Sequence, residues 1–151
     1  MTDKDETRET GNGAIPRHHE VYCGEGVKPP AEVPDSLRQP VSAKSPARWA
    51  YERLVLYVKN FEDQLDGEHE VAMGFAGSDA GVLRIEGMGY FDPDIVTFYG
   101  ADATGAKTQL IQHVSQLNVL LRAMPRRSEE KPPSRIGFRL AADLEQSEAQ
   151  S

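Results

Sequence analysis

The chain has 151 residues, which suffices for one ordinary domain and is too short for two. Its net charge is −7, and residues 45–125 hold 11 acidic against 6 basic side chains. Binding to duplex nucleic acid needs a face rich in lysine and arginine, so we expect no nucleic-acid partner. The single cysteine excludes an intramolecular disulfide, and no run approaches the roughly 18 apolar residues of a membrane span. We therefore expect a cytoplasmic protein with no membrane partner.

Residues 1–44 are predicted to form a disordered arm, because they are rich in proline and charge and poor in clustered aliphatic side chains. Too little apolar surface is available there to offset roughly 1 to 2 kcal/mol of backbone entropy per residue. Deletion of residues 1–43 should then leave the melting temperature unchanged. The alternative is that residues 21–23 add an edge strand to the sheet.

A helix is predicted to begin at Ser45 and Pro46, because serine is a favoured N-cap and proline fits the first helical turn. It should extend to about Asp66. Tyr51, Val55 and Tyr57 widen its apolar arc, which favours deep burial over contact with a second surface. The main apolar stripe has three- and four-residue spacing and consists of Ala50, Leu54, Val58, Phe61 and Leu65.

Four strands are predicted after this helix. Residues 68–75 alternate with period two, residues 77–81 form a loop, and residues 82–91 form the return strand. In the return strand, Gly87 and Gly89 indicate a bulge or the close approach of another group. Turns at residues 92–94 and 102–105 bound strands at 95–100 and 107–114. The fold class is α+β, with a four-stranded antiparallel meander.

The last part of the chain predicts two further elements. A second helix should follow Ser115 and stop at Pro125, with Leu117, Leu120, Leu121 and Met124 on one face. Residues 126–134 form a polar linker, and alternation at residues 135–141 suggests a fifth strand before a frayed tail. The α+β domain is expected to occupy residues 45–125.

The sequence contains no complete catalytic or metal-binding motif. His18, His19, Cys23 and nearby Glu20 resemble zinc ligands, but a structural site needs about four and no second ligand pair follows. The loop at residues 77–81 lacks the G-x-S-x-G pattern of a serine nucleophile. We therefore expect no cofactor, no metal and no catalytic residue.

Four residues are candidates for binding. His69 and His113 lie on predicted strands, and histidine is a residue type suited to proton transfer and polar binding. The two would meet only if their strands pair in a suitable register. Glu68 and Glu70 should point to the face opposite His69. Tyr90 and Tyr99 each adjoin a phenylalanine, so at least one ring of each pair must point away from the main core.

Residues 45–122 resemble a bacterial family of unknown function found largely in alphaproteobacteria. The resemblance is carried by Trp49-Ala50-Tyr51-Glu52-Arg53-Leu54, residues 68–89, Thr97-Phe98-Tyr99-Gly100 and residues 109–117. It implies a cytoplasmic bacterial protein with variable tails, and it implies no activity, cofactor or catalytic residue.

Two functional hypotheses follow. The preferred one is a non-enzymatic interaction module whose aromatic or acidic surface binds a protein partner or a second copy of the chain. The alternative is a small-molecule-binding or catalytic domain, with a pocket near residues 87–90 and with His113 and His69 as polar groups. The first is favoured because apolar faces are abundant and no catalytic set is assembled.

Overall fold

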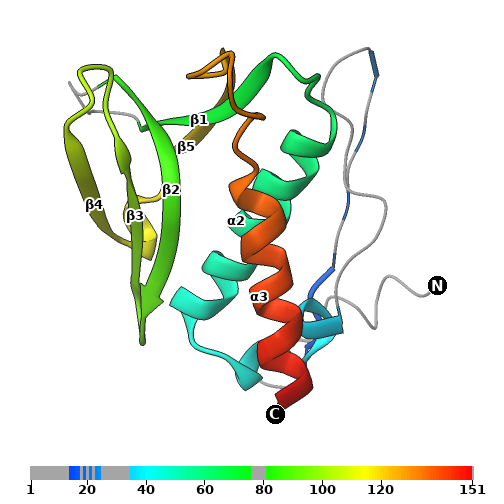
Figure 1. Cartoon of the computed structure of the whole chain (residues 1–151). Coiled ribbons are helices and arrows are strands. Elements are labelled where there is room, and N and C mark those ends of the chain that lie inside the picture. The colour runs from blue at the N-terminus through cyan, green and yellow to red at the C-terminus, as the bar shows by residue number, and fades with distance from the viewer. Residues whose placement is uncertain are drawn as a thin grey trace.

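The computed structural model of the protein describes residues 14–17, 19, 21, 23–24, 35–75 and 81–150. Two layers make up the fold (Figure 1). One is an antiparallel sheet, and the other is a pair of helices, α2 (Pro46–Asp63) and α3 (Ile136–Gln150), which lie side by side on one face of that sheet. No helix in these ranges is both long and apolar enough to cross a membrane.

The sheet has five strands in the order β4-β3-β2-β1-β5. The expected meander of the first four strands is confirmed, including a register shift between Ile85 and Gly87 that marks the anticipated bulge. The strand bounds are β1 His69–Phe75, β2 Val82–Phe91, β3 Ile95–Ala101, β4 Lys107–His113 and β5 Val119–Pro125. Three short 3-10 turns, η2 (Asp35–Arg38), η3 (Val41–Ala43) and η4 (Val114–Gln116), complete the described elements.

Helix α2 begins where the sequence predicts. The Ser45 hydroxyl accepts a hydrogen bond from the Arg48 backbone N–H at 3.0 Å, and proline occupies the first turn. The helix ends at Asp63, slightly earlier than the expected Asp66. Its apolar arc is wide because it packs against both the sheet and α3, which buries Tyr51, Val55 and Val58. The other members of the predicted stripe are partly buried, and Tyr57 is 47% exposed.

The predicted helix after Ser115 is wrong. The chain instead forms η4 and then β5, which pairs antiparallel with β1 along its whole length, from His69 opposite Pro125 to Phe75 opposite Val119. β1 pairs with β2 only at Met73 and Gly74, so most of its other backbone groups need a second partner. A run of leucines at short spacing does not distinguish a strand from a helix. The need of the β1 backbone for a second hydrogen-bonding partner favours the strand.

The predicted strand at residues 135–141 is also wrong, because this segment is the first half of α3. Ile136 and Leu140 are buried, whereas Phe138 between them is 67% exposed. A spacing of four places Ile136, Leu140 and Leu144 on one helical face. The apparent alternation arose because Phe138 is apolar without being part of the core.

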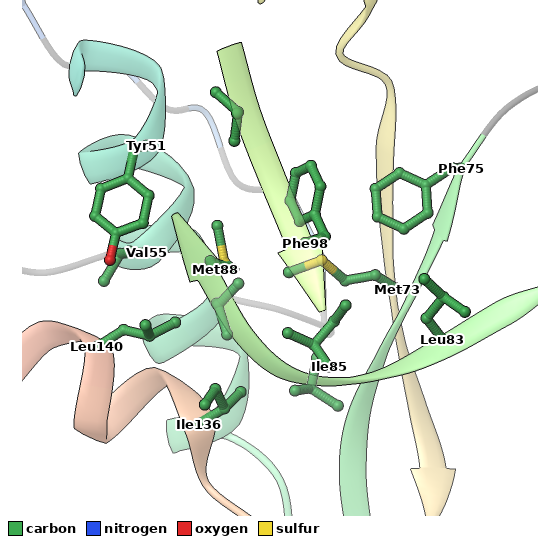
Figure 2. Packing of buried hydrophobic residues seen from close by; sticks show 13 residues of the cluster. Tyr51, Val55, Met73, Phe75, Leu83, Ile85, Met88, Phe98, Ile136 and Leu140 are labelled. Atoms are coloured by element: carbon green, nitrogen blue, oxygen red, sulfur yellow. The ribbon is translucent and has the colours of Figure 1, made fainter. Parts of the chain in front are cut away.

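The core lies between the sheet and the two helices (Figure 2). Phe98 of β3 is completely buried, and its ring centroid lies 4.9 Å from that of Phe75 on β1. Ile136 and Leu140 of α3 complete the same cluster from the helical side. β1 is buried on both faces, contrary to the single buried face that its alternation suggests. The five-stranded sheet and the helix pair therefore form one packed unit around this core.

Candidate functional site

The two candidate histidines do not meet. His69 lies on β1 and His113 on β4, and β2 and β3 separate these strands. The ring of His69 is hydrogen bonded to the Asp66 carboxylate, with 2.7 Å between Nδ1 and Oδ1, and this bond lowers the pKa of Asp66. Each histidine therefore has its own local partners, and no Glu–His or His–His pair suited to proton transfer is formed.

His113 has a structural role at the end of β4. Its Nδ1 accepts a hydrogen bond from the Ser115 backbone N–H at 3.0 Å, and its own backbone N–H donates to Gln116 Oε1 at 2.9 Å. Together these bonds form a capping box for η4. Its Nε2 lies 3.1 Å from Asp94 Oδ2. The ring thus holds the turn that directs the chain from β4 toward β5.

The two candidate tyrosines lie on opposite faces of the sheet. Tyr90 pairs with the buried Val96 and points toward the helices, where its ring centroid lies 5.2 Å from that of Tyr51. Tyr99 pairs with Gly87 on the other face and is 42% exposed. They therefore cannot contribute to a single site.

The face of β2, β3 and β4 that points away from the helices is called here the outer sheet face. Its exposed apolar side chains are Phe91, Tyr99 and Ile111, with exposed fractions of 75%, 42% and 61%. The pairing of Phe91 with Ile95 and of Ile111 with Thr97 places them on the same side of the sheet. Within the described parts of the chain, neither helix covers this face (Figure 1).

The glycines of β2 leave space for Tyr99 on this face. A methyl group at Gly87 would lie 3.5 Å from Tyr99 Cδ2, and one at Gly89 would lie 3.1 Å from Thr97 Oγ1. The Thr97 hydroxyl donates to the Tyr99 hydroxyl at 3.3 Å. The group that approaches Gly87 is thus a side chain of the protein itself, the ring of Tyr99.

Three buried glutamates, which sequence reasoning did not select, hold the connecting segments. Glu52 is 1% exposed and forms ion pairs with Lys44 and Arg48. Glu70 accepts from the Ser134 backbone N–H at 2.7 Å and pairs with Arg84 and Arg127. The alternation in β1 does not predict that Glu70 is buried, because the partners of Glu70 come from distant segments.

Glu62 is the third, and it caps α3. Its Oε1 accepts from the Gly137 backbone N–H at 2.8 Å, whereas Oε2 has no hydrogen-bond partner. Burial raises the pKa of Glu62 to about 7, against the lowering effect of the backbone N–H groups and of Arg135. Glu62 is not part of the apolar stripe of α2, and nothing local in the sequence indicates that a second helix starts above it.

A pocket of about 290 Å³ opens on the helical side of the sheet, beside Gly89 and Tyr90. It is therefore near the predicted residues 87–90, but neither His69 nor His113 lines it. Its other walls come from α2 and α3. The missed residues are Arg48, Tyr51, Glu52, Asp143 and Leu144.

The cluster considered for zinc lies partly outside the described residues, since His18 and Glu20 are among those not described. His19 and Cys23 are exposed. Within the described ranges, no group of three or more histidine, cysteine, aspartate or glutamate side chains could hold a metal ion.

The chain belongs to a family of unknown function, DUF6173, whose model matches residues 41–139. This match starts four residues before Ser45 and ends in the first turn of α3, so it covers more of the chain than the predicted residues 45–122. A search of curated proteins and a search of solved structures found no match.

Proposed function

We propose that the protein is a non-enzymatic interaction module that binds a second copy of itself through the outer sheet face. The observation that carries this proposal is the exposure of Phe91, Tyr99 and Ile111 on three adjacent strands. Exposed apolar side chains that are grouped on one face do not stabilise a monomer, and such groups commonly mark interfaces.

The charges at the two ends of the face favour a second copy as the occupant. Asp92 and Asp94 lie at the end where β3 begins. Lys107 and Arg84 lie beside Ala101 at the opposite end, where Lys107 pairs with Glu86 at 3.5 Å and Arg84 with Glu70 at 3.2 Å. A two-fold axis perpendicular to the strands would bring the acidic end of one copy to the end of the other that carries Lys107 and Arg84. The apolar side chains would then meet in the middle of the interface.

Nucleic acid is a poor occupant, because the chain carries a net charge of −7. A catalytic role receives no support from His69 or His113, which act as local hydrogen-bonding groups. The proposed site of action is the cytoplasm, because one exposed cysteine requires no oxidising compartment.

The test is the oligomeric state by analytical ultracentrifugation over a range of concentrations, near physiological salt so that repulsion between two acidic copies is screened. The wild type should approach twice the monomer mass of 16.7 kDa. Phe91→Ser and Ile111→Lys should each weaken the dimer by roughly 30-fold or more, which corresponds to about 2 kcal/mol.

Phe138→Ser is the matched control, because Phe138 is 67% exposed on α3, away from the outer sheet face. It should leave the dimer intact. A wild type that stays monomeric at all concentrations would overturn the proposal. So would a dimer that resists Phe91→Ser and Ile111→Lys but dissociates with Phe138→Ser.

A further inference from the structure

The pocket beside Tyr90 is separate from the outer sheet face. It opens between the start of α2, the end of β2 and the middle of α3, on the helical side of the sheet. Its volume of about 290 Å³ is close to the lower end of the roughly 300 to 1,000 Å³ that is typical of small-ligand sites. The lining residues are Arg48, Tyr51 and Glu52 of α2, Gly89 and Tyr90 of β2, and Asp143 and Leu144 of α3.

Two tyrosine rings form an apolar wall of the pocket. Tyr51 is only 6% exposed, and its ring is inclined at 50° to that of Tyr90. Burial, and secondarily the negative charge of Asp143, raises the pKa of the Tyr51 hydroxyl to about 12, so it stays protonated and can donate a hydrogen bond. The wall therefore combines aromatic surface with a polar edge.

The charges in and beside the pocket sum to zero, because two cations, Lys44 and Arg48, face two carboxylates, Glu52 and Asp143. Glu52 is neutralised by Lys44 and by Arg48, whose Nε lies 3.0 Å from Glu52 Oε2. The terminal N–H groups of Arg48 make no hydrogen bond with any described residue, and its side chain is 38% exposed. They are free to donate to a ligand.

Asp143 provides the opposite charge from α3. Its carboxylate forms no hydrogen bond or ion pair with any residue in the described ranges, although it lines the same pocket as Arg48. Arg48 and Asp143 thus present a donor and an acceptor to the same pocket without forming an ion pair with each other. A ligand that carries both charges would satisfy both residues.

We propose that this pocket binds a small zwitterion with an aromatic body, of the free aromatic α-amino acid class. Its carboxylate would accept from the Arg48 guanidinium, its ammonium group would donate to Asp143, and its ring would pack on Tyr51 and Tyr90. A simple cation would meet Arg48 and a simple anion would meet Asp143, so either would leave one charged group of the pocket without a partner.

Isothermal titration calorimetry with L-phenylalanine tests the proposal on the full chain. Phenethylamine and 3-phenylpropionate are the comparison probes, since each lacks one of the two charges. Both should bind roughly 10-fold more weakly than L-phenylalanine, as expected for the loss of one charge-assisted contact. Glycine should bind more weakly still, because it has no ring.

Two conservative variants assign the charges. Asp143→Asn should remove the advantage of L-phenylalanine over 3-phenylpropionate. Arg48→Lys keeps a cation near Glu52 but lacks the guanidinium fork, so it should remove the advantage over phenethylamine. Phe138→Ser, on α3 but not among the residues that line the pocket, is the control and should leave all affinities unchanged. Melting curves of each variant establish that it is folded.

The absence of saturable L-phenylalanine binding at about 10 mM would overturn the proposal. Phenethylamine binding as tightly as L-phenylalanine, or unchanged affinity in folded Asp143→Asn and Arg48→Lys, would also overturn it. These results do not depend on the oligomeric state, so a failure here is distinguishable from a failure of the outer sheet face as an interface.

Discussion

Individual carboxylates decide how the connecting segments of this protein are held. Three glutamates are almost completely buried, namely Glu52, Glu62 and Glu70. Glu52 pairs with Lys44 just before α2, Glu62 accepts from Gly137 at the start of α3, and Glu70 accepts from Ser134 in the segment before α3. Burying a carboxylate is costly unless its oxygens are satisfied, so such a residue constrains where its partners lie. Glu62 is the least satisfied of the three, because only one of its oxygens has a partner.

The raised pKa of Glu62 predicts a pH-dependent stability. Because the folded-state pKa of about 7 exceeds the ordinary value of 4.5, the folded chain binds the proton more tightly than the unfolded chain. This group is therefore neutral toward stability below about pH 4.5, and it becomes destabilising as pH rises to 7. The cost above pH 7 should be on the order of 3 kcal/mol.

Glu62→Gln should remove this dependence while keeping the bond from the Gly137 backbone N–H. Chemical denaturation at pH 5, 6, 7 and 8 measures it as the difference between wild type and variant. Asp63→Asn, at an exposed position of the same helix, serves as the control. Parallel pH profiles for wild type and Glu62→Gln would contradict the assignment.

Alanine substitutions at Phe98 and Tyr99 test which face of β3 points toward the core. Phe98 is fully buried, so Phe98→Ala should lower the free energy of unfolding by roughly 3 to 5 kcal/mol. Tyr99 lies on the outer sheet face, so Tyr99→Ala should cost less than about 1 kcal/mol. Thermal melts compare the two variants. A larger loss for Tyr99→Ala would mean that the register of β3 is inverted.

At the scale of elements, the contact between α2 and α3 depends on a glycine. A methyl group at Gly137 would lie 2.7 Å from Lys59 Cα and 2.8 Å from Lys59 N, and backbone atoms cannot move aside locally. The start of α3 can therefore rest against α2 only because this position has no side chain. Glu62 caps the helix at the same point.

Gly137→Ala should force the start of α3 away from α2 and cost roughly 1 to 3 kcal/mol, despite the better helix propensity of alanine. The measurement is the free energy of unfolding, together with hydrogen exchange of the α3 amides. Gly67→Ala is the control, because a methyl group there would meet nothing within 4 Å. Faster exchange in α3 is expected for Gly137→Ala alone.

At the scale of the whole molecule, the packed unit extends to the N-terminal side of Ser45. Leu37 of η2 is 5% exposed, and the Trp49 indole N–H donates to the Val41 carbonyl oxygen at 2.6 Å. These contacts join the end of the predicted arm to α2. They therefore predict that deletion of residues 1–43 lowers the melting temperature, contrary to the expectation from the sequence.

Leu37→Ala should cost roughly 2 kcal/mol through lost burial, and deletion of residues 1–43 should cost at least as much. Val41→Ala is the control, since its side chain is 42% exposed and only its backbone is used. Thermal melts with Trp49 fluorescence as the probe report both the stability and the environment of the indole. An unchanged melting temperature for the deletion would restore the boundary at Ser45.

The sequence by itself determined the elements whose signals are local. Ser45 and Pro46 cap α2 through bonds within one turn, and β1 to β4 follow from period-two alternation interrupted by turn residues. The same alternation places Phe98 and Tyr99 on opposite faces, and the packing against the helices decided that Phe98 is the buried one. Self-association and the binding roles of Tyr90 and Tyr99 stay predictions that the proposed experiments address.

Only the tertiary structure decided the elements whose partners are distant. Residues 119–125 form a strand because β1 needs hydrogen-bond partners, and residues 136–150 form a helix because α2 offers an apolar face and the Glu62 carboxylate. The pocket likewise requires Tyr51, Tyr90 and Asp143 from three separate elements. Hydrogen bonding of the backbone and burial of apolar side chains act between segments that are distant in the sequence. They therefore outweigh the local preference of each segment for a helix or a strand.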